Sequence, residues 1–356
     1  MVAQRWRAAA RRTRWRRAAL ASAAAAAGAA AAAIIAAAGQ PPAGPPVLRV
    51  VTAIPLPGDS SRFDYASLDA RQGLLFAAHL GASDVVEINI RAGAVVRVIP
   101  GLAQVHGVLV VPALHRVYAT ATGVNRVARI NEDSGQVLGM TPTGAYPDGL
   151  AYDWADGTIW TTNESGGSET IIDAATGAPR GSVQLGGEAG NVAYDPPTGQ
   201  MLVDVQTRDQ LAVIDPFTRS VSRRVPLPGC DHDHGLTLDS PDRLAFIACD
   251  GNAALLTLDL TSWRITSTAT VSAQPDVLAY DPHAGRLYVA AENGWVTILT
   301  RHGRRLQVTG SDHLAGGAHV VTVDPGTGRS YYPVPQGPEG RPALLICQFL
   351  RRPQPS

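Results

Sequence analysis

The sequence predicts an all-β fold: a single seven-bladed β-propeller, closed by an N-terminal strand that pairs with the last blade. The first observation is an internal repeat, since seven units of about four short strands follow one another at nearly constant spacing. The second is that the repeat region starts with a lone strand and ends one strand short. Together they assign residues 47–350 to one domain.

One position in each unit marks the period. It lies five places before the residue that closes the unit's first strand. Along the chain this position holds Asp64, His106, Asp148, Gly190, His234, Asp276 and His319. The intervals are 42, 42, 42, 44, 42 and 43 residues, which is typical of radially repeated blades.

Residues 1–39 form a segment of a different kind. Seven arginines between positions 5 and 17 precede an apolar, Ala-rich run over residues 18–38. This pattern predicts an export signal, with Arg16-Arg17 loosely similar to a twin-arginine signal. Uncleaved, the run is long enough for a membrane anchor, and a disordered tail is the third interpretation. We therefore expect a periplasmic or extracellular protein, or one anchored to the membrane through this segment alone.

A Pro- and Gly-rich linker at residues 40–46 leads to the lone strand at residues 48–56, LRVVTAIPL. This strand resembles the fourth strands of other units, at residues 94–100, 220–227 and 264–271. The last unit offers only three strands, at residues 319–324, 329–334 and 342–350, before a short tail at 351–356. Pairing the N-terminal strand there would close the ring and cover an open sheet edge.

Residues 274–299 show the repeated unit most clearly. The segments VLAYD, RLYVAA and WVTIL are rich in β-forming residues, and the turns PHAG and ENG separate them. This alternation predicts consecutive antiparallel strands.

The formal net charge of the chain is zero, which argues against nucleic acid as a partner.

The units resemble the YVTN β-propeller repeat. The resemblance rests on AGRLYVAAENGWVTIL, HRVYATATGVNRVARI and QMLVDVQTRDQLAVID, and it covers about 300 residues of whole units, although no unit spells YVTN. Membership of this YncE-like group implies an exported seven-bladed propeller. It implies no single activity, because the group mixes binding proteins with relatives of lactonases and lyases.

The period-defining positions predict a site. In a propeller the first strands line the central channel, so their starting residues should converge on one mouth. The candidate ligand-binding residues are Asp64, His106, Asp148, Asn191 (beside Gly190), His232, His234, Asp276 and His319. A second ring is expected from the loops after the second strands: His79, Asn163, Glu164, Gln206, Asp250, Asn252, Glu292 and Asn293.

Two interpretations of this mouth stay open beside simple contact with water. In the first, the protein is a monomeric binding or scaffold propeller that holds a small ligand, a cation or another envelope protein there. In the second, His106, His234 and His319 hold a divalent metal ion, because neutral imidazoles suit zinc, copper, iron or nickel. A metal-dependent hydrolase, lactonase or lyase would then use the same ring.

The three cysteines divide into a pair and a single residue. Cys230 precedes the first strand of the fifth unit and Cys249 ends its second strand, so the two ends of one hairpin should lie close together. An exported protein permits a disulfide between them. Cys347 lies in an apolar strand and is expected to be a buried free thiol.

Overall fold

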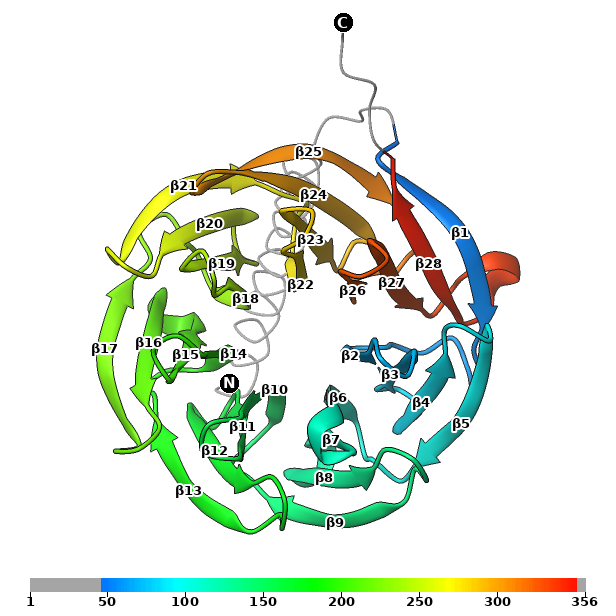
Figure 1. The fold of residues 1–356 in the computed structure, drawn as a ribbon, viewed down its shortest axis with the longest axis horizontal. Coiled ribbons are helices and arrows are strands. Elements are labelled where there is room, and N and C mark those ends of the chain that lie inside the picture. The colour runs from blue at the N-terminus through cyan, green and yellow to red at the C-terminus, as the bar shows by residue number, and fades with distance from the viewer. Residues whose placement is uncertain (1–45, 351–356) are drawn as a thin grey trace, which may run out of the picture. The chain divides into compact units, whose positions relative to one another are not determined.

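Seven four-stranded antiparallel sheets surround a central channel in the computed structural model, which describes residues 46–350 (Figure 1). This confirms the predicted propeller. The only helical elements in that range are four 3-10 turns, η1 (Pro112–Leu114), η2 (Thr122–Val124), η3 (Gln206–Arg208) and η4 (Pro338–Gly340). No helix of the described range is long and apolar enough to cross a membrane.

The blades follow one another along the chain, each running from the channel outward. Blade 1 consists of β2 (Ala66–Asp69), β3 (Leu74–His79), β4 (Asp84–Asn89) and β5 (Ala94–Pro100). Blade 2 consists of β6 (Val105–Val111), β7 (Arg116–Ala121), β8 (Arg126–Asn131) and β9 (Val137–Pro142). Blade 3 consists of β10 (Pro147–Asp153), β11 (Thr158–Asn163), β12 (Ser168–Asp173) and β13 (Pro179–Gln184). Blade 4 consists of β14 (Ala189–Asp195), β15 (Gln200–Val205), β16 (Gln210–Asp215) and β17 (Ser220–Pro226). Blade 5 consists of β18 (Asp233–Asp239), β19 (Leu244–Cys249), β20 (Ala254–Asp259) and β21 (Arg264–Thr270). Blade 6 consists of β22 (Pro275–Asp281), β23 (Arg286–Ala291), β24 (Trp295–His302) and β25 (Arg305–His313). Blade 7 consists of β26 (Thr322–Asp324), β27 (Arg329–Val334), β28 (Ala343–Phe349) and β1 (Leu48–Pro55).

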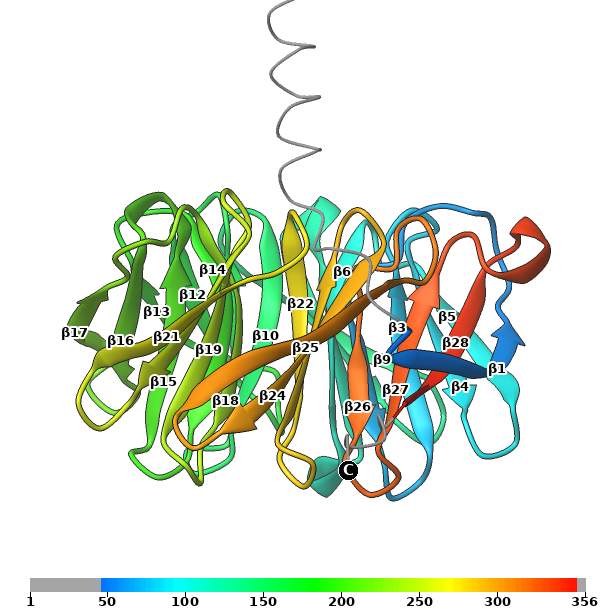
Figure 2. The same cartoon turned by 90° about the horizontal axis from the view of Figure 1, so that it is seen from above.

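The N-terminal strand closes the ring as predicted. β1 pairs antiparallel with β28, from Leu48 opposite Phe349 to Pro55 opposite Ala343, and Figure 2 shows the two strands together at the rim. The Asp312 carboxylate of blade 6 accepts hydrogen bonds from the Val47 and Leu48 amides at 2.8 and 2.6 Å. Closure therefore joins the N-terminal strand to blades 6 and 7 together.

Apolar side chains fill the spaces between neighbouring blades. One such cluster packs Tyr288 and Val296 of blade 6 against Tyr332 and Leu345 of blade 7. Near the channel, neighbouring inner strands approach so closely at two glycines that no side chain fits there. A Cβ atom at Gly107 would lie 2.1 Å from the Asp148 carbonyl oxygen, and one at Gly235 would lie 2.4 Å from the Asp276 carbonyl oxygen.

The inner strands of blades 1 and 7 are shorter than the others. β26 begins at Thr322 rather than at the expected residue 319, and β2 begins at Ala66. The amide of Tyr65 donates to the carbonyl of His106 in blade 2 rather than within its own sheet. Asp64 and His319 thus precede their strands, whereas the equivalent residues of the other blades lie inside them. The predicted signal segment, most of the linker and the tail fall outside the described residues.

Candidate functional site

A pocket of about 650 Å³ opens at one mouth of the channel. Five of the period-defining residues line it: Asp64, His106, Asp148, His234 and Asp276. They come from blades 1, 2, 3, 5 and 6, so the predicted convergence on one mouth is present. Gly190 offers no side chain, and His319 lies behind Asp64 and Asp276 with 1% of its side chain exposed.

Two further rings with the same period complete the wall. Residues two places before the period-defining position contribute Arg62, Gln104, Tyr146, His232 and Gln274. Residues sixteen places after it contribute Leu80, Glu164, Gln206, Asp250 and Glu292. Four members of the second ring were among the loop residues expected from the sequence. Of the first ring, only His232 was predicted from the sequence.

The first ring has a backbone cause. Gln104, Tyr146, His232 and Gln274 all adopt a left-handed conformation, with φ between 48° and 64°. Each residue stands just before its inner strand, where the chain turns sharply from one blade to the next. Such a turn places the side chain over the channel, and the recurrence in four blades makes it a property of the repeat.

Tyr65 forms the floor of the pocket. Its hydroxyl donates to Asn191 Oδ1 at 2.9 Å, and Asn191 Nδ2 donates to the His234 carbonyl at 3.1 Å. Tyr65 directly precedes β2 of blade 1 and Asn191 lies in β14 of blade 4, so this pair spans the channel. Asn191, a predicted ligand contact, therefore supports the floor and is not among the residues that line the pocket.

Arg62 forms ion pairs with the carboxylates on one side of the pocket. Its Nη2 lies 2.8 Å from Asp64 Oδ1 and 3.5 Å from Asp276 Oδ2, and its Nη1 lies 2.7 Å from Glu292 Oε1. Three carboxylates from blades 1 and 6 thus share one guanidinium. Each carboxylate on this side therefore has a cationic partner, although their combined negative charge exceeds the charge of Arg62.

His234 carries a second positive charge. Gln206 donates from Nε2 to the Ala189 carbonyl at 2.8 Å, so its Oε1 faces His234 Nδ1 at 3.0 Å and must accept. His234 Nε2 lies 3.2 Å from Asp276 Oδ1. Burial alone would favour the neutral ring, but the hydrogen bond to Asp276 and the charge of that carboxylate outweigh burial and raise the pKa of His234 to about 10.

His106 and Tyr146 form a separate pair at the blade 2 and blade 3 edge. His106 Nδ1 donates to the Gln104 carbonyl at 2.9 Å. In the neutral ring Nε2 is then the acceptor of the Tyr146 hydroxyl, 3.0 Å away. The Tyr146 side chain is 40% exposed and presents an aromatic surface to the pocket.

Blade 3 supplies the carboxyl groups that lack a cationic partner. Among the residues described, no ion pair is formed by Asp148 or Glu164, and Asp148 Oδ1 has no hydrogen-bond partner. Burial raises the pKa of Asp148 well above its usual value, and the charge of Asp64 adds to the effect. Burial likewise raises the pKa of Glu164. A nearby cation would favour the ionised form of both groups.

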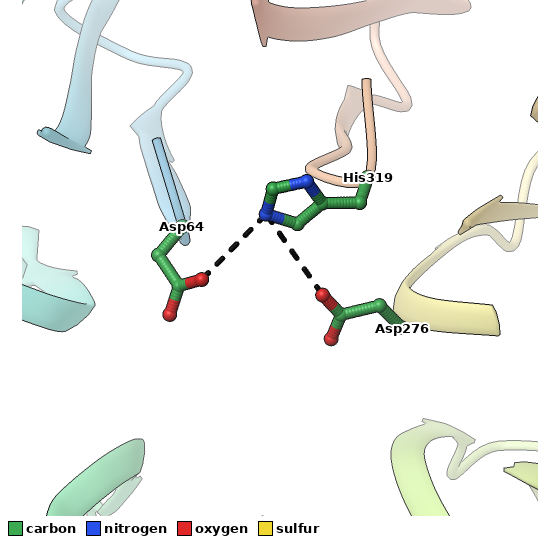
Figure 3. A group of neighbouring side chains, drawn as sticks. All are labelled: Asp64, Asp276 and His319. Carbon is green, nitrogen blue, oxygen red and sulfur yellow. Dashed lines mark ion pairs between the residues drawn. The ribbon is translucent and has the colours of Figure 1, made fainter. Parts of the chain in front are cut away.

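The predicted three-histidine metal site is not assembled. Both ring nitrogens of His106 are engaged, by Gln104 and Tyr146, and both of His234 are engaged, by Gln206 and Asp276. Within residues 46–350 the only compact group of three potential ligands is Asp64, Asp276 and His319 (Figure 3). The even spacing of the three histidines along the repeat could not reveal these neighbours, which engage His106 and His234.

A disulfide fixes the loop that carries two pocket histidines. Cys230 and Cys249 are bonded, with Cα atoms 5.4 Å apart, and Cys347 is a buried free thiol. Next to the bond, the Asp250 amide donates to the His232 carbonyl at 3.1 Å, and His232 Nδ1 lies 2.9 Å from Asp250 Oδ1. The covalent link therefore holds the blade 5 wall of the pocket.

Gly190 interrupts the Asp/His ring because a buried acid pair lies beside it. A Cβ atom at Gly190 would lie 2.9 Å from Asp204 Cβ and 2.9 Å from the Asp233 carbonyl oxygen. Both Asp204 and Asp233 have 0% exposure, and neither Asp204 carboxyl oxygen has a hydrogen-bond partner. Burial and the charge of Asp233 raise the pKa of Asp204 well above its usual value.

The acid pair predicts that stability falls as pH rises. Between pH 4 and the raised pKa of Asp204, the unfolded chain has released a proton that the folded protein still holds. Asp204→Asn should remove the contribution of Asp204 to this loss, so it should raise the free energy of unfolding at pH 8 and have little effect at pH 4.5. Urea unfolding at both pH values measures it, with exposed Asp156→Asn as the matched control. An equal effect of Asp204→Asn at both pH values would refute a titrating pair.

Comparisons with known proteins return the fold. Three similar solved structures are "Crystal structure of RRP9 WD40 repeats" (TM-score 0.71, 11% identity, 87% of this chain and 99% of that one), "Streptogramin B lyase structure" (0.71, 13%, 85% and 98%) and "Kuenenia stuttgartiensis Hydrazine Synthase" (0.68, 12%, 76% and 92%). No protein-family model matches the chain, and no curated protein matches its sequence. The chain thus has the seven-bladed propeller fold shared by WD40 repeats and streptogramin B lyase, and its resemblance to the YVTN family stays a prediction.

Proposed function

We propose that this protein is an exported binding propeller whose channel mouth holds a small organic cation. The observation that carries the proposal is the charge of the pocket. Six carboxyl groups line it, from Asp64, Asp148, Glu164, Asp250, Asp276 and Glu292, against one arginine. Arg62, His234 and His232 partner four of them, which leaves Asp148 and Glu164 for a ligand.

The blade 3 side suits an amine or a guanidinium. Asp148 and Glu164 supply carboxylate acceptors once their protons leave, and the ring of Tyr146 offers a face for a cation. The Tyr65–Asn191 floor limits how deeply a ligand enters. Binding of a cation therefore favours ionised Asp148 and releases a proton, so affinity should increase with pH until the raised pKa of Asp148 is passed.

Export is part of the proposal. The arginine-rich, Ala-rich segment at residues 1–39 has the order of a signal, and the Cys230–Cys249 disulfide suits an oxidising compartment. A protein segment from the cell envelope that presents a Lys or Arg side chain would satisfy the same chemistry as a free amine. YVTN-like membership is proposed on the repeat sequence alone.

A thermal-shift and calorimetric screen tests the cation proposal. The probes are spermidine, agmatine, choline and arginine, with matched carboxylic acids and neutral polyols as controls. At least one cation should raise the melting temperature by a few degrees, and affinity should rise from pH 5.5 to pH 8. Asp148→Asn/Glu164→Gln should weaken binding at least tenfold, about 1.4 kcal/mol, whereas Asp156→Asn should not. Stabilisation by the anions alone would contradict the proposal.

The second candidate is a hydrolase or lyase, and one observation favours it. The raised pKa of Asp148 favours its protonated form, and the positively charged His234 lines the same pocket, so a hydrolase or lyase would have two proton donors there. In that case Asp148→Asn would abolish turnover of a bound ester or lactone while leaving its binding intact. Loss of binding in the same variant favours the binding protein.

A further inference from the structure

Three buried side chains from three blades point at one spot beside the pocket (Figure 3). Asp64 of blade 1, Asp276 of blade 6 and His319 of blade 7 each offer one ligand atom, and these atoms lie within 4.8 Å of one another. They meet where the ring is closed, because the short inner strands β2 and β26 leave Asp64 and His319 on the connections before them.

His319 is the unusual member of this group. Its side chain is 1% exposed, yet neither ring nitrogen has a hydrogen-bond partner. Nε2 lies 3.6 Å from Asp64 Oδ1 and 3.9 Å from Asp276 Oδ2, and Nδ1 lies 3.7 Å from Glu292 Oε2. A buried polar group without a partner is costly and rare.

The spacing suits ligands that share an ion. Two atoms that each lie about 2.0–2.2 Å from a tetrahedral metal ion are separated by roughly 3.4 Å. The distances from Nε2 to the two carboxylates are slightly longer than that. One imidazole combined with carboxylates suits zinc or manganese, whereas calcium and magnesium prefer oxygen ligands alone.

We propose that Asp64, Asp276 and His319 form a site for one divalent transition-metal ion, and that Arg62 is its built-in competitor. The Arg62 guanidinium contacts the same carboxylates, 2.8 Å from Asp64 Oδ1 and 3.5 Å from Asp276 Oδ2. An ion must displace this positive charge before it can bind. Because the Arg62 side chain is 40% exposed, it has room to withdraw into solvent.

Displacement of Arg62 would also give Glu292 a role in the proposed site. In the structure its carboxylate is held by Arg62 Nη1 at 2.7 Å, on the open side of the group. Once Arg62 withdraws, Glu292 becomes available as a further oxygen ligand. The metal site shares the pocket wall through Asp64, Asp276 and Glu292. It lies on the side of blades 1, 6 and 7 and uses neither Asp148 nor Glu164, the two carboxyl groups assigned to the organic cation.

Zinc and manganese binding to full-length, untagged protein tests this inference. Equilibrium dialysis with elemental analysis and calorimetry should compare wild type, Arg62→Ala and Arg62→Ala/His319→Gln. Arg62→Ala should bind one Zn²⁺ per chain at least tenfold more tightly than wild type. The added His319→Gln change should remove that gain, because it deletes the nitrogen ligand. Arg62→Gln serves the same comparison if the alanine variant fails to fold.

Two results would overturn the inference. One is equal zinc affinity of wild type and the Arg62 variants, and the other is a gain that persists without His319. Asp148→Asn/Glu164→Gln separates the two proposals, because it should leave zinc binding by the Arg62→Ala background unchanged while it weakens organic cations. Conversely, His319→Gln in the wild type should spare organic-cation binding.

Discussion

Deletion of residues 47–56 is expected to abolish cooperative folding. β1 and its flanks bury Val47, Leu48, Ile54 and Leu56 at 7% exposure or less. Burying one such side chain contributes about 1.5–3 kcal/mol, so together they rival the roughly 5–15 kcal/mol net stability of a typical domain. The deletion also exposes β28 as an open edge and removes the two backbone hydrogen bonds to the Asp312 carboxylate.

Point variants give the same test on a finer scale. Ile54→Ala should lower the free energy of unfolding by about 2–5 kcal/mol, whereas Val50→Ala, at a position 45% exposed on the same strand, should change it by at most about 0.5 kcal/mol. Urea unfolding measures both. A synthetic peptide of residues 46–56 should partly restore the deleted protein. An unchanged melting temperature after deletion would contradict the closure.

Loss of the Cys230–Cys249 disulfide is expected to cost about 3 kcal/mol, the value of the chain-entropy model for a loop of roughly twenty residues. The link joins positions 19 residues apart and holds the loop that presents His232 and His234. Cys230→Ala/Cys249→Ala should therefore lower stability and also weaken ligand binding in the pocket. Denaturant melts with and without dithiothreitol measure the first effect.

Thiol counting provides the control for that experiment. Unfolded, non-reduced protein should show one reactive thiol, from Cys347, and three after reduction. Dithiothreitol should then leave the double variant unaffected. Three reactive thiols before reduction, or equal stability of oxidised and reduced protein, would show that the bond does not form.

The sequence predicts the architecture well because the propeller repeats one local pattern. A 42-residue period, punctuated by turns such as PHAG, sets the number of blades, and the orphan strand at residues 48–56 sets the closure. The short β26 could not be predicted, because residues 319–321 read like the inner strands of other units. Their departure depends on how the closing blade meets its neighbours.

The sequence predicts where the site lies, but not which of its side chains pair with one another. The period puts Asp64, Asp148 and Asp276 at one mouth, since each lies at or just before the start of an inner strand. Arg62 and Tyr146 were missed, although they recur at the same period two residues earlier. Whether a carboxylate contacts Arg62 or stays unpaired like Asp148 depends on the directions of side chains from different blades. The repeat pattern of the sequence does not determine these directions.

The central claim is that the start of the inner strands builds a cation pocket with free carboxyl groups on blade 3. A crystal structure of the protein with the tightest-binding cation of the screen tests it most directly. The account predicts that the ligand nitrogen lies within hydrogen-bond distance of Asp148 or Glu164, above Tyr65. A ligand bound instead at the opposite end of the blades, for example beside Asp281 and Arg286, would contradict the account.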